Sequence, residues 1–403
     1  MAKKTIADVD LQGKAVLMRV DFNVPLDEDK NVTNDRRIAL ALPSIQKVLD
    51  AGGKLVLMSH LGRPKGEVKP EYSLKPAADR LGELLGKSVQ LGPEDVAGEQ
   101  AQKMASELGG GDVLVLENVR FDPREESKDE ATAQEFGDQL GRMGEVYVND
   151  AFGTCHRKHA SMYGAAKAIQ AKGGPAVAGL LVEKEIKYLH EAVDQPERPF
   201  VAILGGAKVS DKIKLISSLL GKVDKILIGG AMAYTLLKAK GASVGKSMVE
   251  QDQVDEMKSL LEKAGDKILL PRDHVGAPEF GSEEAKQIAS VDIPDDLMGL
   301  DIGPETIAAF SQEIKAAKTI VWNGPMGVFE RDAYANGTKA IAHAVAEATK
   351  NGATSVIGGG DSAAAVEQMD LGGQMTHVST GGGASLTYLE GKPMPPIEVL
   401  DER

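Results

Sequence analysis

Short runs of β-branched and aliphatic residues recur along the chain, separated by stretches in which apolar residues have helical spacing. The first half holds such runs at 15–22, 54–60, 112–121 and 145–152. The second half holds them at 200–206, 225–230, 267–273, 319–325, 354–361 and 376–383. Strands that alternate with helices are typical of βαβ units. The pattern therefore predicts an α/β protein with two doubly wound, Rossmann-like parallel-sheet domains.

One amphipathic helix is predicted between the two halves. Its apolar face consists of residues three or four positions apart, which are Val182, Ile186, Leu189 and Val193. The prolines of "QPERP" at 195–199 end it, because proline removes a backbone donor and biases its predecessor away from helical geometry. We expect this interdomain helix at about 176–194, with the domain boundary near residue 185.

The length of the chain sets the number of domains. At 403 residues it exceeds the size at which one hydrophobic core usually stops growing, so two domains are expected, with one large domain as the alternative. We place them at 1–180 and 181–390, with a hinge and a central cleft. The residues after 390 carry three prolines and no periodic pattern, which predicts an extended tail at about 391–403.

Composition and charge narrow the function classes. The first ten residues, "MAKKTIADVD", have no apolar core typical of a signal peptide, and no run of about 18 apolar residues could span a bilayer. The single cysteine, Cys155, agrees with a reducing compartment, and the net charge of -13 repels phosphate chains in general. We expect a cytoplasmic protein with no membrane or nucleic-acid partner, whose anionic ligands meet a local concentration of positive charge.

Glycines follow the predicted strands of the second half. They stand at 205–206, 229–230, 324, 358–360 and 381–383. In parallel α/β sheets, ligands bind beyond the carboxyl ends of the strands, where helix N-termini present free N–H groups. One glycine after a strand is usually only a turn, but several such ends around one crevice favour an anionic cofactor with several phosphates.

Two charged residues sharpen this prediction. Lys208 follows the glycine pair after the strand at 200–206, where an ammonium group can hold a transferring phosphoryl group. Asp361 follows three glycines and would suit Mg²⁺, which prefers a carboxylate together with phosphate oxygens and waters. The alternatives are a solvated lysine near a helix start and an aspartate that caps a helix.

The first half places cations at its strand ends instead. Arginine forms paired hydrogen bonds with carboxylate and phosphate oxygens, so a cluster of arginines in an acidic protein indicates a small anionic substrate. Asp21 and Asn23 beside them would suit substrate hydroxyls. Taken singly, each arginine could be only a surface residue. The cationic residues are Arg36, His60, Arg63, Arg120, His156, Arg157 and His159.

Rival motifs fit less well. In "GASVGKS" at 241–247 only three residues separate the glycines, where a phosphate-binding P-loop needs four, so we expect a surface connection with a solvated Lys246. "CHRKH" at 155–159 offers too few ligands for a structural zinc site, and adjacency in sequence does not make Cys155 a nucleophile. No G-x-G-x-x-G follows the first strand, which weakens a dinucleotide-binding reading.

With these residues assembled, the chain resembles the phosphoglycerate kinase family along essentially its whole length. The first half carries the resemblance in "RVDFNVP", "SHLGRP", "VLENVRF" and "DAFGTCHRKHAS". The second half carries it in "AILGGAKVSDKI", "IGGAMAYTLL", "MGLDIGP", "IVWNGPMGVFE", "VIGGGDSAAA" and "HVSTGGGASLTYLEGK". The resemblance implies reversible phosphoryl transfer from 1,3-bisphosphoglycerate to ADP, giving 3-phosphoglycerate and ATP, with Mg²⁺ as cofactor and a monomeric protein.

The resemblance also assigns roles to residues. The N-terminal domain would bind the glycerate substrate through Asp21, Asn23, Arg36, His60, Arg63, Arg120 and Arg157. The C-terminal domain would bind the nucleotide through Gly205, Lys208, Lys212, Gly299, Asn323, Glu330, Gly358, Gly359, Gly360, Asp361 and Ser362. Glu330 would hold the ribose hydroxyls, and Asp361 the metal. The catalytic groups would be Arg36, Lys208 and the helix start at Gly381, Gly382 and Gly383. The tail would return to the N-terminal domain.

Two departures from the family pattern and one feature of the mechanism complete the expectation. Cys155 stands where many relatives have alanine, which raises the hypothesis of sensitivity to oxidation. Ser362 stands where many have threonine, but it keeps the hydroxyl. No general base is needed, because the attacking group is a phosphate oxygen of ADP or an ionised carboxylate. Transfer would then depend on alignment, neutralisation of charge and closure of the two domains.

Without the resemblance, three other classes remain open: another carboxylate kinase, an ATP-dependent ligase, and a two-lobed binding protein with no catalysis. A binding protein has no evident use for Lys208 and Asp361 at glycine-rich strand ends. An assay with 3-phosphoglycerate and MgATP would separate these classes.

Overall fold

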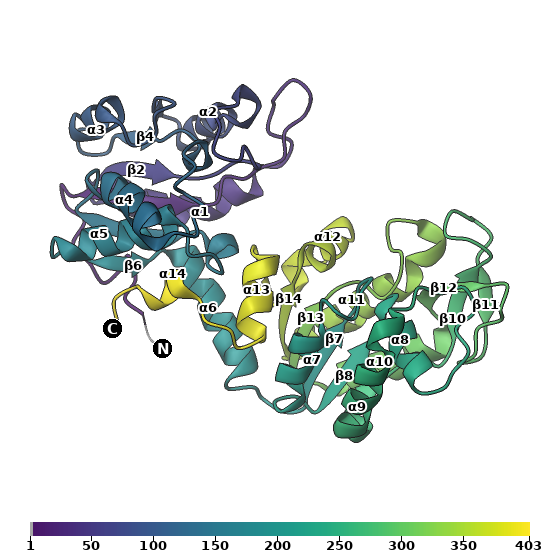
Figure 1. The fold of residues 1–403 in the computed structure, drawn as a ribbon. Helices are drawn as coiled ribbons and strands as arrows, with labels where there is room; N and C mark the ends of the chain where they lie inside the picture. The colour runs from purple at the N-terminus through teal and green to yellow at the C-terminus, as the bar shows by residue number, and fades with distance from the viewer. Residues whose placement is uncertain (1–2) are drawn as a thin grey trace. The chain divides into compact units, whose positions relative to one another are not determined.

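The computed structural model describes residues 3–403, which form two compact units (Figure 1). The first unit contains the residues up to Ile186 together with Pro393–Arg403, and the second contains Lys187–Lys392. Each unit has its own parallel sheet and its own hydrophobic core. The prediction of two parallel-sheet α/β domains is therefore confirmed.

The sheet of the first unit has six parallel strands. They are β1 (Ala15–Val20), β2 (Lys54–Met58), β3 (Gln90–Leu91), β4 (Val113–Val115), β5 (Val146–Asp150) and β6 (Ala176–Ala178). Their order across the sheet is β3-β4-β2-β1-β5-β6. The four central strands lie within the apolar runs of the first half. The sequence pattern does not predict the edge strands β3 and β6, which are only two and three residues long.

Both faces of this sheet are covered. Val16, Met18 and Val20 of β1 pack in one core with α1 (Arg36–Asp50) and α2 (Lys75–Leu85). Leu17 is buried on the opposite face, where Gly144 brings it close to α5 (Ala165–Ala171). This alternation follows from the two-residue period of a strand. The remaining helices before β6 are α3 (Glu99–Ser106) and α4 (Glu130–Gly141).

The C-terminal residues pack in the first unit. Gln170 Nε2 donates a hydrogen bond to the backbone oxygen of Val399 at 2.8 Å, and Asn149 Nδ2 donates to that of Pro396 at 3.1 Å. The sequence pattern predicts an extended tail. The tail is not fully extended, however, because α14 (Pro395–Glu398) forms one helical turn. Proline is favoured at the first helical position, where its missing N–H has no helical partner to lose.

One helix, α6 (Leu180–Val193), crosses the boundary between the units along the chain. Val182, Leu189 and Val193 on its predicted apolar face are buried. It begins later than 176, because residues 176–178 form β6, and it ends before the prolines at 195–199.

The main sheet of the second unit also has six parallel strands. They are β7 (Phe200–Leu204), β8 (Lys225–Ile228), β9 (Ile268–Leu269), β13 (Thr319–Asn323), β14 (Thr354–Gly358) and β15 (His377–Val378). Their order is β15-β14-β13-β7-β8-β9, which in chain order is the 3-2-1-4-5-6 arrangement of Rossmann-type sheets. The switch point of that arrangement lies between β7 and β13, where such folds bind ligands.

A second, antiparallel sheet in this unit is not predicted by the sequence pattern. Its order is β11-β10-β12, formed by β10 (His274–Ala277), β11 (Lys286–Ile288) and β12 (Met298–Ile302). The run at 267–273, expected as one strand, yields only the two residues of β9. Pro271 follows closely, and proline cannot donate to a strand ladder, so the parallel pairing stops there.

Helices cover the main sheet and lead away from its strand ends. Val201, Ile203, Ile320 and Trp322 pack with residues of the two longest of these helices, α10 and α11, in one core. The helices of this unit are α7 (Ile213–Leu220), α8 (Met232–Ala239), α9 (Val254–Ala264), α10 (Pro304–Ala316), α11 (Asn336–Lys350), α12 (Gly360–Gln368) and α13 (Gly382–Leu389). Between residues 3 and 403, no helix has the length and apolar character needed to cross a bilayer.

Candidate functional site

The predicted substrate residues of the first unit follow strands that are neighbours in its sheet. Asp21 and Asn23 follow β1, His60 follows β2, Arg120 follows β4, and Arg157 lies in the loop after β5. These strands are parallel and adjacent in the order β4-β2-β1-β5, so their carboxyl ends lie along one edge. The topology alone therefore brings these side chains to one side of the unit.

Asp21 and Asn23 are held by partners within this edge. Arg37 and Asp21 form an ion pair, with 3.0 Å between Arg37 Nη1 and Asp21 Oδ2. Asn23 Oδ1 accepts a hydrogen bond from the backbone N–H of Gly62 at 2.9 Å. The loop after β1 is thereby tied to the loop after β2, which fixes the spacing of the two polar side chains.

A buried guanidinium lies beneath the edge. Arg19 is fully buried in β1, and its Nη2 lies 3.0 Å from Nδ1 of His60. Its Nε donates to Ser161 Oγ at 2.9 Å. Ser161 in turn donates to both carboxylate oxygens of the buried Glu125, from Oγ at 2.6 Å and from its backbone N–H at 2.8 Å. A continuous chain of hydrogen bonds therefore supports His60 from inside the unit.

The other arginines of this edge differ in exposure. Arg120 is 3% exposed, donates from Nη1 to the backbone oxygen of Gly62 at 2.8 Å, and has its Nε 3.2 Å from Glu126 Oε1. Its buried Nη2 has no hydrogen-bond partner within residues 3–403. Arg36, the first residue of α1, and Arg157 are half-buried, while Arg63 is exposed.

The electrostatics of this edge favour an anion. Burial and the charges of Arg19 and Arg120 hold the pKa of His60 well below its usual range. Burial and the same cations lower the pKa of His159 to about 3. Burial also lowers the pKa values of Arg36 and Arg120, since desolvation opposes their charge. A bound anion would relieve these costs, so the edge is suited to an anionic ligand.

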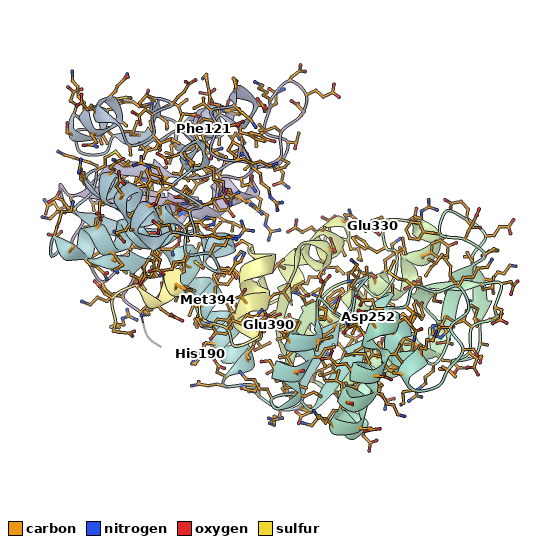
Figure 2. All side chains as sticks on the ribbon, viewed as in Figure 1. Phe121, His190, Asp252, Glu330, Glu390 and Met394 are labelled. Carbon is orange, nitrogen blue, oxygen red and sulfur yellow. The ribbon has the colours of Figure 1, made fainter. Side chains whose placement is uncertain are left out.

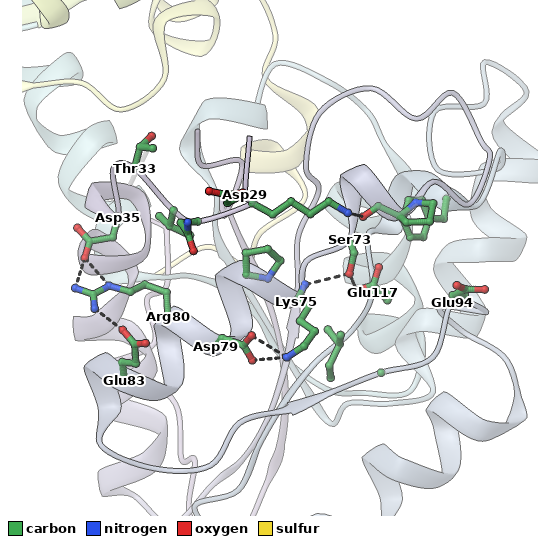
Figure 3. Close-up of a pocket in the computed structure, with 18 of the residues that line it drawn as sticks. Asp29, Thr33, Asp35, Ser73, Lys75, Asp79, Arg80, Glu83, Glu94 and Glu117 are labelled. Carbon is green, nitrogen blue, oxygen red and sulfur yellow. Dashed lines mark hydrogen bonds and ion pairs between the residues drawn. The ribbon is translucent and has the colours of Figure 1, made fainter. Parts of the chain in front are cut away.

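A nearby cavity of about 1240 Å³ has a different character (Figure 3). Its charged walls are largely paired with one another: Arg80 bridges Asp35 and Glu83, and Lys75 pairs with Asp79. Acidic residues outnumber basic ones along it, so it repels anions. We therefore do not place the anionic substrate in this cavity, despite its size.

In the second unit, the glycine-rich strand ends enclose a pocket of about 540 Å³. Its walls come from the loops after β7, β13 and β14 and from the start of α13, which surround the switch point of the sheet. Its lining residues include Gly205, Lys208, Lys212, Asn323, Gly359, Gly360, Asp361, Ser362, Gly382 and Gly383.

Two positions in this pocket require glycine, one because of a close backbone approach and one because of its backbone conformation. Gly382 at the start of α13 lies against Gly359 and Gly360 at the start of α12, and a Cβ at 382 would lie 3.1 Å from the Gly360 nitrogen. Gly359 has φ of 92°, a left-handed conformation that side chains disfavour. Two helix N-termini are thereby packed side by side, and their N–H groups and dipoles both favour a negative ligand.

One amide in the pocket has its orientation set by a neighbour. Lys212 Nζ donates to Asn323 Oδ1, and burial lowers the pKa of Lys212. An ammonium group can only donate, so the Asn323 NH₂ group must point the other way. Asn323 is 1% exposed, and its Nδ2 has no hydrogen-bond partner within residues 3–403. A ligand oxygen in the pocket would satisfy this donor.

Ser362 and Asp361 are adjacent but differ in their surroundings. Ser362 is fully buried, and its Oγ accepts a hydrogen bond from the Gly324 backbone N–H at 2.6 Å. Asp361, like Lys208, is exposed at the pocket. Within residues 3–403, no three His, Cys, Asp or Glu side chains gather as a metal site. A Mg²⁺ ion carried by a nucleotide needs only one carboxylate plus phosphate and water ligands, so Asp361 fits it.

The remaining predicted nucleotide residues and Gly381 do not line this pocket. Gly299 belongs to β12 of the antiparallel sheet, and its backbone approaches the ring of Tyr234. Gly358 ends β14, and Gly381 immediately precedes α13. Glu330 is exposed in the turn that follows β13 (Figure 2).

Sequence reasoning missed the residues that support the first edge, namely Arg19, Arg37, Glu125 and Ser161. Arg19 did carry a signal, because a charged residue inside an apolar strand requires a buried partner. That partner could not be located from the chain, since Ser161 lies 142 positions away from Arg19.

Two other features of the sequence have structural answers. The segment at 241–247 follows α8 rather than a strand, and Lys246 is exposed, as expected. This segment also contains G-x-S-x-G, a pattern of serine hydrolases. A nucleophile elbow joins a strand to a helix, however, whereas this segment follows the helix α8, so the pattern does not form an elbow here.

Cys155 is fully buried, and burial raises its pKa to about 12. The thiolate is the reactive form, so we expect mild peroxide to leave activity unchanged.

Comparisons with known proteins agree with one another. The sequence profile of a family described as phosphoglycerate kinase matches residues 6–392. A phosphoglycerate kinase of Rhodopirellula baltica is 56% identical over 406 residues, and one of Chlorobium phaeobacteroides (strain BS1) is 55% identical, each alignment covering 100% of both chains.

Solved structures show the same relation. The structure of phosphoglycerate kinase from Coxiella burnetii matches with a TM-score of 0.88 and 39% identity, and that from Pyrococcus horikoshii OT3 with 0.83 and 32%. Each covers 98% of both chains. Sequence and fold thus agree over nearly the full length, and the chain belongs to the phosphoglycerate kinase family.

Proposed function

We propose that this protein catalyses the reversible transfer of a phosphoryl group from 1,3-bisphosphoglycerate to ADP, giving 3-phosphoglycerate and ATP in glycolysis and gluconeogenesis. The acceptor in the reverse direction is a carboxyl group. The observation that carries the proposal is the pair of strand-end sites: a cluster of arginines and histidines in one unit, and two adjacent glycine-rich helix N-termini in the other. One suits a small phosphorylated acid, and the other suits a polyphosphate.

In the first unit, the cations would bind the phosphate and carboxylate of the glycerate substrate. His60, Arg63, Arg120 and Arg157 would provide donors, and the unpartnered Nη2 of Arg120 supports this role. Asp21 and Asn23 lie at the same edge, where they would meet a hydroxyl group. Arg36 would lie at the reacting end of the substrate and neutralise charge on the transferring group.

In the second unit, the N–H groups at the starts of α12 and α13 would hold the phosphates, and Lys208 would contact the transferring group. The unpartnered Nδ2 of Asn323 would donate to a phosphate or ribose oxygen. Gly299 and Glu330 would contact the nucleoside, with Glu330 on the ribose hydroxyls. Asp361 would hold Mg²⁺, which when bound with the nucleotide neutralises phosphate charge.

The chemistry needs no general base. A phosphate oxygen of ADP and the carboxylate of 3-phosphoglycerate are both ionised near neutral pH, so neither nucleophile must lose a proton. In-line transfer then depends on alignment and on neutralising the charge of the phosphoryl oxygens by Arg36, Lys208 and the N–H groups at 381–383.

The two ligands must meet, so we also propose that the units close when both are bound and exclude water from the acyl phosphate. Small-angle X-ray scattering should show compaction only with 3-phosphoglycerate and nucleotide together. Equal profiles for the free and doubly liganded protein would contradict closure. We propose a cytoplasmic monomer, for which light scattering on the eluted protein should give one mass near the 42.6 kDa of the chain.

A coupled assay tests the function directly. The purified protein should consume MgATP with 3-phosphoglycerate, and omission of Mg²⁺ should abolish turnover. With acetate in place of 3-phosphoglycerate the rate should be at background, because acetate offers no phosphate to the arginine cluster. Turnover of acetate, or none with 3-phosphoglycerate, would overturn the proposal.

A further inference from the structure

Arg19 offers more than charge to the first unit, because each end of its guanidinium group has an assigned partner. Nε donates to Ser161 Oγ at 2.9 Å, Nη1 donates to the backbone oxygen of Val20, and Nη2 faces His60 Nδ1 at 3.0 Å. The side chain is fully buried, so no water competes for these donors. Arg19 is therefore fixed in direction as well as in position.

The contact between Arg19 and His60 determines where the proton of the imidazole ring lies. A guanidinium group has only donors and stays protonated in proteins. Its contact at 3.0 Å is a hydrogen bond only if Nδ1 of His60 is the acceptor. An imidazole that accepts at Nδ1 carries its proton on Nε2 and is neutral.

The surroundings of His60 favour the same state. The charged and titratable groups that face it are Arg19 on β1, Arg37 on α1, Arg120 after β4 and His159 after β5, and each of these is cationic or neutral. None of them is a carboxylate that could stabilise an imidazolium ion. Together with burial, they lower the pKa of His60 well below its usual range.

A second layer keeps Arg19 in place. Ser161 Oγ accepts from Arg19, so its own proton goes to Glu125 Oε1 at 2.6 Å. The backbone N–H of Ser161 donates to the other carboxylate oxygen at 2.8 Å. Glu125 is fully buried, and burial raises its pKa to about 7. When it is ionised, it supplies the countercharge to Arg19 through this single serine, and every proton in the chain from Glu125 to His60 then has one direction.

We propose that Arg19, held by Ser161 and Glu125, is a positioning residue that fixes His60 as a neutral Nε2–H donor for an oxygen of the anionic substrate. This inference rests on the proposed function for the identity of that substrate. Within residues 3–403 the ring of His60 makes one hydrogen bond, at Nδ1, and the residue keeps 4% of its surface exposed, so the Nε2 donor is available to a ligand. His60 then contributes a directed hydrogen bond rather than a titrating charge.

Nitrogen-15 NMR of the unmodified protein tests the tautomer without reference to activity. Long-range correlations from ring carbon protons separate the three states of an imidazole, and His60→Gln identifies the signals of residue 60. At pH 7 we expect a protonated Nε2 and an unprotonated Nδ1. A proton on Nδ1, or an imidazolium ion, would overturn the proposal.

Variants test whether Arg19 is the cause. Arg19→Met alone would leave Glu125 buried without a countercharge, so the informative variant is Arg19→Met combined with Glu125→Gln. We expect the His60 tautomers to mix and the KM for 3-phosphoglycerate to rise about tenfold, the size expected for one hydrogen bond to a charged group, with the KM for ATP unchanged. An unchanged tautomer, or an unchanged KM for 3-phosphoglycerate, would contradict the role.

A matched control makes the same chemical change elsewhere in the unit. Arg142 and Glu99 are exposed and, between residues 3 and 403, form no ion pair with the site, so Arg142→Met with Glu99→Gln should leave both the tautomer and the KM values at their original levels. If the double variant of Arg19 and Glu125 does not fold, the NMR result on the unmodified protein still decides the tautomer. Absence of turnover with the expected tautomer would refute the proposed function and not the contact.

Discussion

The two strand-end sites present positive charge to a possible anionic ligand through different groups. In the first unit the positive charge is carried by side chains that are themselves buried and bonded, such as Arg19 and Arg120, which are 0% and 3% exposed. In the second unit the wall is glycine backbone at two helix starts, and the charged residues Lys208 and Asp361 are exposed. One site is rigid through its side chains, the other through its main chain.

The difference has a physical consequence for selectivity. A guanidinium group locked by its neighbours selects ligands by the direction of their oxygens, so it suits one small rigid acid. Backbone N–H groups approach a ligand closely and add no formal charge, so under the proposed function they would tolerate both ADP and ATP, which differ by one phosphate. Mutations should therefore weaken ligand binding at the first site through lost charge and at the second through added bulk.

The largest expected effect comes from removing one cation from either site. Arg36→Ala and Lys208→Ala should each lower kcat by roughly 10²–10⁴-fold, because each would remove charge stabilisation of the transferring phosphoryl group. The coupled assay measures kcat, and circular dichroism should show an unaltered fold. Near-normal kcat in either variant would refute the role assigned to that residue.

Added bulk on the main chain should give a smaller effect, confined to the second site. In Gly382→Ala the new methyl group would meet the backbone of Gly359 and Gly360 at 3.1 Å, so α12 and α13 must separate. We expect about tenfold weaker binding of MgADP in calorimetry, the cost of misplacing one good hydrogen bond.

The control for this effect is Gly373→Ala. A Cβ at residue 373 has nothing within 4 Å, and the position lies outside the pocket lining. Its affinity for MgADP should match that of the original protein. Equal affinity in Gly382→Ala would mean that the contact between the two helix starts does not shape the phosphate site.

The strands that the sequence pattern predicted correctly and the two sites that it predicts share one property: their signal is local. Long apolar runs predicted the central strands, and glycines or arginines directly after them predicted the two edges. The short edge strands β3 and β6 and the antiparallel strands β10–β12 carry too few apolar residues to be distinguished. The support beneath His60 was missed for a different reason, because Glu125 and Ser161 meet Arg19 only in the folded chain.

Each unit contains a buried aspartate whose protonation affects the free energy of unfolding, Asp150 in the first and Asp301 in the second. Burial raises the pKa of Asp150 and of Asp301 to about 7, whereas an unfolded aspartate releases its proton near 3.8. The folded state therefore binds more protons between about pH 4 and 7, so both groups make stability fall as pH rises through this window. They differ in their hydrogen bonds: within residues 3–403, Asp150 Oδ2 has no hydrogen-bond partner, while both oxygens of Asp301 accept backbone hydrogen bonds.

Replacement by asparagine should affect the stability of the protein differently at the two positions. In Asp150→Asn, Oδ1 can still accept from the Leu181 N–H, and the new NH₂ group replaces an oxygen that had no partner. In Asp301→Asn, the NH₂ group must face a backbone N–H of either Ile302 or Gly337. At pH 4, where burial keeps both original aspartates protonated in the folded state, we expect Asp150→Asn to keep its unfolding midpoint, and Asp301→Asn to lose about 1–3 kcal/mol of unfolding free energy.

Urea unfolding measures both variants. Trp322, the single tryptophan, is fully buried in β13, so its fluorescence follows the second unit, while far-UV circular dichroism follows both. Asp150→Asn should also flatten the fall in stability between pH 4 and 7. Equal losses in the two variants would show that the unpartnered oxygen of Asp150 does not distinguish the units.

The smallest expected effect tests whether the lysine position, rather than lysine chemistry, defines the second site. Lys246 follows two glycines, as Lys208 does, yet its segment follows α8 and leads to no helix at the carboxyl edge of the sheet. Among residues 3–403, the one hydrogen-bond contact of its Nζ is with the Pro278 carbonyl oxygen, at 3.5 Å, and Lys246 is exposed. Lys246→Ala should leave MgADP affinity in calorimetry and kcat unchanged, beside the loss of kcat in Lys208→Ala. A large loss of affinity would place the phosphates at 241–247 and remove the main-chain site from the comparison.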